Sequence, residues 1–171
     1  MSTPSAGAAA IAPASAPPLP GNQGGAPWAA PQYKYRSFFV YELDFNSNAV
    51  DTDVLPSGGN VSSSFNIAGD SDFFLTKICV TAAPTSDTPV FGAVPADVLA
   101  TIINTTTGRQ YMSAGVPLAN IMGLGGLPFL LPQVTLWAAK STIQVSLTGL
   151  PGSDGYEYIG LSFIGIKAFT S

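Results

Sequence analysis

Histidine is absent from this chain of 171 residues, and cysteine occurs once, at Cys79. Histidine is the side chain that most often moves protons near neutral pH, so its absence removes the usual base of a serine or cysteine triad. Because no such base exists to activate Cys79, we interpret that residue as a small buried apolar side chain. A single cysteine forms no disulfide within the chain, so stability does not depend on an oxidising compartment.

Charged side chains are also scarce. They make up 9 % of the chain, whereas about 25 % is usual, and the net charge is −4. The six basic residues are scattered, so we expect no direct binding of nucleic acid. The acidic balance disfavours anionic membrane surfaces. Hydrophobic residues reach 46 %, more than one small domain can hide, which predicts a protein partner or a homo-oligomer.

Targeting signals are the third absence. No lysine or arginine precedes Lys34, so the positive segment of a secretory signal is missing. The most apolar region, residues 116–132, is broken by glycine and proline, whereas a membrane helix needs about 20 consecutive apolar residues. We therefore expect no membrane partner and assembly in a cytoplasm.

Residues 1–32 differ in composition from residues 33–171, and we predict an extended arm followed by one domain. The arm consists mainly of alanine, proline, glycine and serine and carries no charged side chain. Its prolines favour extended, polyproline-like geometry. Ile11, Leu19 and Trp28 are isolated apolar anchors. Two interpretations stay open: a flexible tail in a free monomer, or an arm lying on neighbouring subunits.

Residues 141–149 carry the clearest structural signal, because Ile143, Val145 and Leu147 alternate strictly with polar residues. This pattern is typical of a strand with one dry face. Similar patterns predict further strands elsewhere in the chain, and no segment has the pattern of a convincing helix. We read residues 114–132 as an ordered loop. Together these features predict an all-β sandwich with jelly-roll or other Greek-key topology. The further strands are expected at 33–45, 61–67, 73–83, 98–104, 109–113, 134–137 and 156–169.

Two of these expected strands are apolar on both faces. In residues 73–83, Phe74, Ile78 and Val80 share one face, while Phe73, Leu75 and Cys79 share the other. Residues 156–169 are apolar on both sides too, with Gly160 and Gly165 as points of bulging or close approach. Such strands are expected to be covered from outside as well as by the core. The predicted interface residues are Ile11, Leu19, Trp28, Phe73, Leu75 and Trp137.

The acidic pairs at 51–53 and 70–72 lack the longer loop pattern of a calcium site, so we interpret them as turn residues. Gly123 to Gly126 lacks the lysine and hydroxyl residue of a phosphate loop. We therefore predict no metal, no cofactor and no catalytic residue.

Two weaker interpretations concern sugars. Carboxylates could in principle support glycoside hydrolysis, but no cleft is indicated around Glu42, Asp97 or Glu157. Aromatic side chains stack on sugars as readily as they anchor interfaces, and we favour the interface. The aromatic residues concerned are Tyr111, Trp137, Tyr156 and Tyr158.

Four short motifs give the body from Phe73 to Lys167 a resemblance to a known group of proteins. They are Asp72-Phe73-Phe74-Leu75, Thr107-Gly108-Arg109, Gly125-Gly126-Leu127-Pro128-Phe129 with Leu131-Pro132, and Ile164-Gly165-Ile166-Lys167. With these turn and core residues, about half the chain resembles the β-sandwich cement or decoration proteins of tailed-bacteriophage heads. The resemblance implies a structural role on the capsid exterior, where dimers or trimers bridge subunits of the major capsid protein. A receptor- or glycan-binding module of a head fibre or tail is the alternative.

Overall fold

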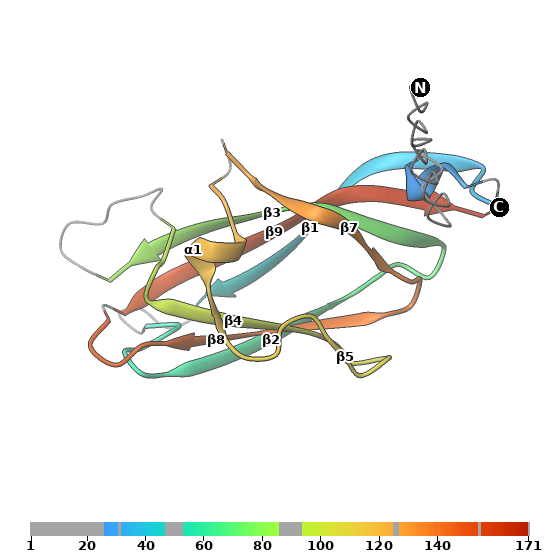
Figure 1. Ribbon diagram of the computed structural model, residues 1–171. Coiled ribbons are helices and arrows are strands. Elements are labelled where there is room, and N and C mark those ends of the chain that lie inside the picture. The colour runs from blue at the N-terminus through green and yellow to red at the C-terminus, as the bar shows by residue number, and fades with distance from the viewer. Residues whose placement is uncertain are drawn as a thin grey trace, which may run out of the picture.

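A computed structural model describes residues 26–30, 32–46, 53–85, 94–124, 127–153 and 155–170. Two antiparallel sheets form a sandwich (Figure 1). Sheet A contains, in spatial order, β1 (Tyr35–Asn46), β9 (Tyr156–Phe169), β3 (Ser71–Pro84) and β7 (Phe129–Trp137). Sheet B contains β2 (Asn60–Asn66), β8 (Thr142–Gly149), β4 (Val98–Asn104) and β5 (Arg109–Gln110), with β6 (Val116–Pro117) also paired to β4.

The strand orders β1-β9-β3-β7 and β2-β8-β4-β5 define a jelly roll. Apart from the steps β4 to β5 and β5 to β6, each strand is followed in sequence by one in the opposite sheet. The two sheets are therefore wound together, and most strand neighbours are distant along the chain. The all-β sandwich is confirmed, and the jelly roll is the one of the expected topologies that the structure adopts.

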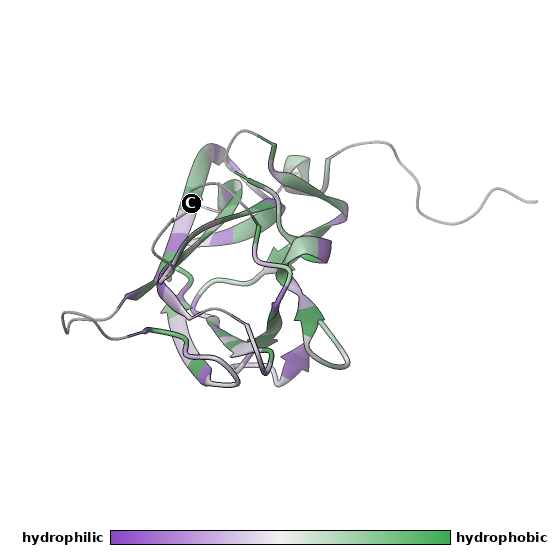
Figure 2. Ribbon diagram, turned by 90° about the vertical axis from the view of Figure 1, so that its left-hand side faces the viewer, coloured by the Kyte–Doolittle hydropathy of each residue, from purple (hydrophilic) through white to green (hydrophobic). Residues whose placement is uncertain are grey.

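The core lies between the two sheets, which Figure 2 shows as separate layers seen along the strands. In β8 the predicted alternation is confirmed, because Ile143, Val145 and Leu147 are fully buried while their neighbours are half-buried on the outer face. Trp137 lies among aromatic rings from both sheets, with ring centres 5.4 Å from Phe163 and 5.7 Å from Phe65. This contact across the layers fixes how the sheets face each other.

The strand β3 changes register in the middle, and the change corrects the predicted faces. The pairing shifts between Leu75 and Lys77, so Thr76 is an extra residue. Before the bulge Phe73 and Leu75 face the core, and after it Ile78 and Val80 do. Opposite the bulge, a side chain on Gly165 would strike the Phe74 carbonyl oxygen, which confirms the close approach predicted there.

The region 114–132 is more regular than expected. It contains a short helix, α1 (Leu118–Ile121), beside the sandwich, and β7 already begins at Phe129 (Figure 1). A loop was expected here partly because of Pro132. However, β7 is an edge strand, where a proline without a backbone N–H breaks no hydrogen bond to a neighbouring strand. Conversely, the strand predicted over 109–113 is only the two residues of β5.

Candidate interaction face

The outer face of sheet A carries apolar side chains in two rows across the strands. In the first row Phe38 of β1 pairs with Ile166 of β9, which also pairs with Phe74 of β3, and Phe74 pairs with Leu136 of β7. In the second row Val40 pairs with Ile164, and Leu130 lies at the β7 end, opposite Lys77 of β3. Strand register thus gathers apolar residues that are far apart in sequence onto one face, with Lys77 as a charged side chain between Ile164 and Leu130 in the second row.

Much of this surface is open to solvent. Phe38 is 69 % exposed, Leu130 66 % and Leu136 47 %, while the β9 residues between them are half-buried. Scattered exposed apolar side chains are normal, but contiguous ones mark a binding surface. We call this surface the outer apolar face and define it as Phe38, Val40, Leu130, Leu136, Ile164 and Ile166.

The Phe74 position, between Ile166 and Leu136 in the first row, is already covered by the chain itself. The segment from η1 (Pro27–Ala29) leads to Tyr33, whose ring meets Phe74 edge-on at 5.4 Å. The Tyr33 hydroxyl donates a hydrogen bond of 2.7 Å to Asp72 Oδ2. Tyr33, Phe74 and Ala168 form a small buried cluster outside the main core, with Val134 and Ile166 packed against it. The described chain therefore begins on this face.

The outer face of sheet B has the opposite chemistry. Ser62 and Ser146 share a hydrogen bond of 2.7 Å, and Asn60 Nδ2 donates to Thr148 Oγ1 at 2.7 Å. In these cross-strand pairs, as in the one between Thr142 and Asn66, each side chain satisfies its neighbour without any charge. The sandwich is therefore two-sided, with a polar outer face on sheet B and an apolar one on sheet A.

The far end of the sheet A surface is acidic. Glu42 and Asp44 of β1 line a shallow hollow of about 130 Å³ together with Tyr158 and Ser162. The Tyr158 hydroxyl donates to Asp44 Oδ1 at 2.7 Å, and this hydrogen bond, with burial and the nearby carboxylates, raises the pKa of Tyr158 to about 12. Within the described ranges, no group of three or more acidic, histidine or cysteine side chains could hold a metal ion.

Three of the predicted interface residues are core residues. Phe73 is 0 % exposed, Leu75 3 % and Trp137 1 %, so none of them presents a surface to a partner. The prediction was wrong for these three because the bulge and the aromatic cluster turn them toward sheet B. Ile11 and Leu19 lie outside the described residues. Trp28 belongs to η1, in the segment that leads to Tyr33, and its side chain is not described.

The acidic turn at residues 70–72 has a structural role. Asp72 accepts from Tyr33 and from the Ala139 amide, and Asp70 accepts from Ser71. At the other turn, Asp53 accepts from Thr85, while residues 51 and 52 lie outside the described ranges. Of the Gly123 to Gly126 turn the structure describes Gly123 and Leu124. Gly123 lies against the 127–129 backbone, where no side chain would fit.

The aromatic residues weighed for sugar stacking do not form an exposed platform. Trp137 and Tyr156 are buried, and the Tyr156 hydroxyl donates to Asp97 at 2.6 Å. Tyr111 and Tyr158 are half-buried. Tyr158 lies in β9 of sheet A, whereas Tyr111 directly follows β5 of sheet B. Glu157 is exposed on β9. These positions give no support to a stacked sugar.

Sequence reasoning missed the members of the outer apolar face. Val40 appeared to sit on a charged face, beside Arg36 and Glu42, and Leu130 lay in a predicted loop. The usable signal was the two-faced apolar pattern of residues 156–169. Because β9 is a central strand, its outward apolar residues indicate that the outer face of sheet A is apolar around them.

Comparison with known proteins gives little. No family model and no curated protein matches the chain. A similar solved structure is the infectious bursal disease virus VP2 subviral particle, at 12 % identity and a TM-score of 0.29. The match covers 80 % of this chain and 37 % of the VP2 chain, so this chain spans well under half of that protein. The superposition is too loose to bear on function. No helix in the described ranges is long and apolar enough to cross a membrane.

Proposed function

We propose that this protein is a structural component of a virion that binds the exterior of a capsid shell and stabilises it by bridging neighbouring subunits of the major capsid protein. The observation that carries the proposal is the outer apolar face on a sandwich whose opposite face is polar. Jelly rolls also serve in lectins and enzymes, so the fold alone is only an analogy.

Bridging requires two separate contact surfaces. The outer apolar face supplies one. The other is the free edge of β1, which runs for 12 residues and pairs only with β9 among the described strands. A long edge strand accepts a strand from another chain through backbone hydrogen bonds. A face contact to one subunit and an edge contact to the next would join two subunits through one copy.

The energy of attachment comes from apolar burial repeated over many copies. Fully burying one large apolar side chain contributes about 1.5–3 kcal/mol. Phe38 and Leu136 keep roughly two-thirds and one-half of their surfaces exposed, so covering both adds about 2–3 kcal/mol per copy. The described chain begins at η1 and places Tyr33 on the same face, which suits an N-terminal arm that reaches an adjacent subunit.

Co-sedimentation with empty capsids of the encoding virus tests the proposal. Wild-type protein is expected to pellet with the shells at a fixed ratio, and the double variant F38S/L136S to bind about 30-fold or more weakly, as loss of ~2 kcal/mol implies. Ile103→Ser is the matched control, because Ile103 is a half-buried residue of β4 on the outer face of sheet B. Circular dichroism checks that all variants are folded.

Two outcomes would contradict the proposal. One is wild-type protein that stays in the supernatant at every shell concentration. The other is equal loss of binding in F38S/L136S and in the Ile103 control, which would mean that the outer apolar face has no special part. Sedimentation equilibrium without shells separately tests whether the protein forms the dimer or trimer that we propose.

A further inference from the structure

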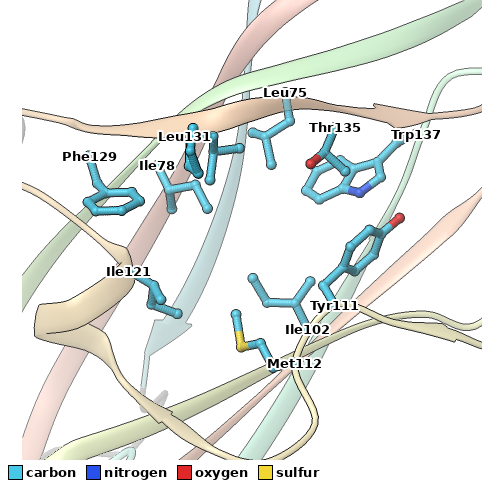
Figure 3. A pocket seen from close by; sticks show the side chains of 11 residues that line it. Leu75, Ile78, Ile102, Tyr111, Met112, Ile121, Phe129, Leu131, Thr135 and Trp137 are labelled. Atoms are coloured by element: carbon cyan, nitrogen blue, oxygen red, sulfur yellow. The ribbon is translucent and has the colours of Figure 1, made fainter. Parts of the chain in front are cut away.

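The two sheets separate at one edge and line a half-open apolar cavity of about 330 Å³ (Figure 3). Its upper wall comes from β3 and β7 and its lower wall from β4 and the segment after β5, while Ile121 of α1 closes one side. No charged side chain lines it. The lining residues are Leu75, Ile78, Ile102, Tyr111, Met112, Ile121, Phe129, Leu131, Pro132, Thr135 and Trp137.

The cavity is a consequence of the local strand pattern. Between the pairs Leu75 with Thr135 and Lys77 with Leu130, β3 has one residue, and β7 has the four residues 131–134. This irregularity takes β7 away from β3 at Leu131 and Pro132, which border the cavity together with the paired Thr135. On the lower side β5 is only two residues long, so sheet B supplies no full strand opposite β7.

One polar group in the cavity wall has no partner. Trp137 is 1 % exposed, and its indole Nε1 finds no hydrogen-bond acceptor among the described residues. In Figure 3 the indole nitrogen lies on the side of the ring nearest Tyr111, which together with Thr135 carries the only hydroxyl groups of the wall. Leaving a buried donor unpaired costs about 1–3 kcal/mol. Nε1 is out of reach of a water-sized probe, so an acceptor oxygen brought by a ligand pairs with it only when a neighbouring side chain of the wall, such as Tyr111 with its ring centre 6.2 Å from that of Trp137, moves aside.

We propose that this cavity binds a neutral, largely apolar small molecule that carries one acceptor oxygen, with Trp137 Nε1 as the donor. Size, apolar lining and a few polar groups are the usual features of a ligand site. At about 30 Å³ for each water-sized group, the cavity holds roughly ten heavy atoms. A carboxylate is excluded as the ligand group, because an unpaired charge in such a wall is costly. The site does not depend on the virion role proposed above.

Two probes with ten heavy atoms each isolate the hydrogen bond: propiophenone, which has an acceptor oxygen, and butylbenzene, which has none. Titrations are followed by heteronuclear NMR of the indole N–H, with a Trp28→Phe background leaving Trp137 as the single indole. Propiophenone is expected to bind about 2- to 12-fold more tightly, the range for one net hydrogen bond. It should also move the Trp137 indole proton downfield, and butylbenzene should not.

Two variants place the binding in this cavity. Ile121→Trp fills it from the α1 side and should abolish binding of both probes. Trp137→Phe keeps an aromatic wall and should remove the preference for the ketone while both probes still bind. If Trp137→Phe does not fold, the indole shift and Ile121→Trp still decide the question. The proposal is overturned if neither probe saturates, if the ketone binds without moving the indole resonance, or if hydrocinnamate, an anionic probe of similar size, binds more tightly than the ketone.

Discussion

Tyr33 fixes the point at which the N-terminal segment meets sheet A, and its removal is the most informative perturbation. Its ring is buried against Phe74, its hydroxyl donates to Asp72, and the next amide, that of Lys34, donates to the Phe169 carbonyl at 2.8 Å. Tyr33→Phe removes only the hydrogen bond. Tyr33→Ala also removes the ring contact and the burial of Phe74.

The sizes of the two effects differ. A hydrogen bond to a charged group is worth about 1.5–3 kcal/mol, and the lower end applies to this partly buried pair. Tyr33→Phe should therefore raise local opening about 10-fold. The ring adds about 0.5–1.5 kcal/mol for edge-to-face contact, together with apolar burial, so Tyr33→Ala should raise opening at least about 100-fold.

Trypsin measures this opening directly, because Lys34 and Arg36 follow Tyr33 in sequence. When opening is fast relative to cleavage, the cleavage rate follows the population of the open form. Rates of cleavage after Lys34 should thus rise about 10-fold in Tyr33→Phe and more in Tyr33→Ala, while the urea midpoint of the whole domain moves little. Tyr35→Phe is the matched control, since Tyr35 is an exposed tyrosine at the start of β1.

Equal cleavage rates in wild type and both Tyr33 variants would refute the reasoning. The pH dependence offers a second check. Burial, and then the hydrogen bond to Asp72, raise the pKa of Tyr33, so the folded state favours the neutral phenol. The contribution of Tyr33 should be complete below its ordinary pKa of about 10 and lost as pH rises through the higher folded-state value.

Three further predictions concern other parts of the molecule. Asp44→Asn should lower the pKa of Tyr158 from about 12 toward its ordinary value, measured by NMR titration; in wild type this interaction stabilises the fold below pH ~10, and that stability is lost between pH ~10 and ~12. Gly165→Val should cost more than about 3 kcal/mol in urea unfolding or prevent folding, because its side chain would strike the backbone at Phe74. Deleting residues 1–25 should leave the thermal midpoint of the domain unchanged and weaken co-sedimentation with shells; undiminished binding would show that the arm has no part in attachment.

Alternation predicted most of the strands because most of them present one face to the core. Residues 98–104 and 156–169 match their predicted ranges, and β8 differs by one residue. None of these strands contains proline, and β9, a central strand of sheet A, accommodates Gly160 and Gly165. Topology was narrowed to a few alternatives, since alternation reports faces but not neighbours.

The candidate face was harder to predict, because it depends on register and on one extra residue. At the bulge, Thr76 shifts the alternation of β3 by one residue. If strict alternation is assumed along the whole strand, the residues on one side of Thr76 are assigned to the wrong face of the sheet. Phe73 and Leu75 were misassigned for this reason. The cavity was equally hidden, because it arises where four residues of β7 face one of β3.

The two outer faces explain how a chain with 9 % charged residues can still meet solvent on one side. Sheet B does so with neutral pairs such as Ser62 with Ser146, in which each hydroxyl satisfies the other and also remains available to water. Sheet A instead presents exposed apolar side chains at Phe38 and Leu136, with Lys77 beside Leu130 on the same face. The scarcity of charge therefore does not require a partner on every side. It predicts a one-sided association in which sheet A turns toward a neighbour and sheet B toward solvent.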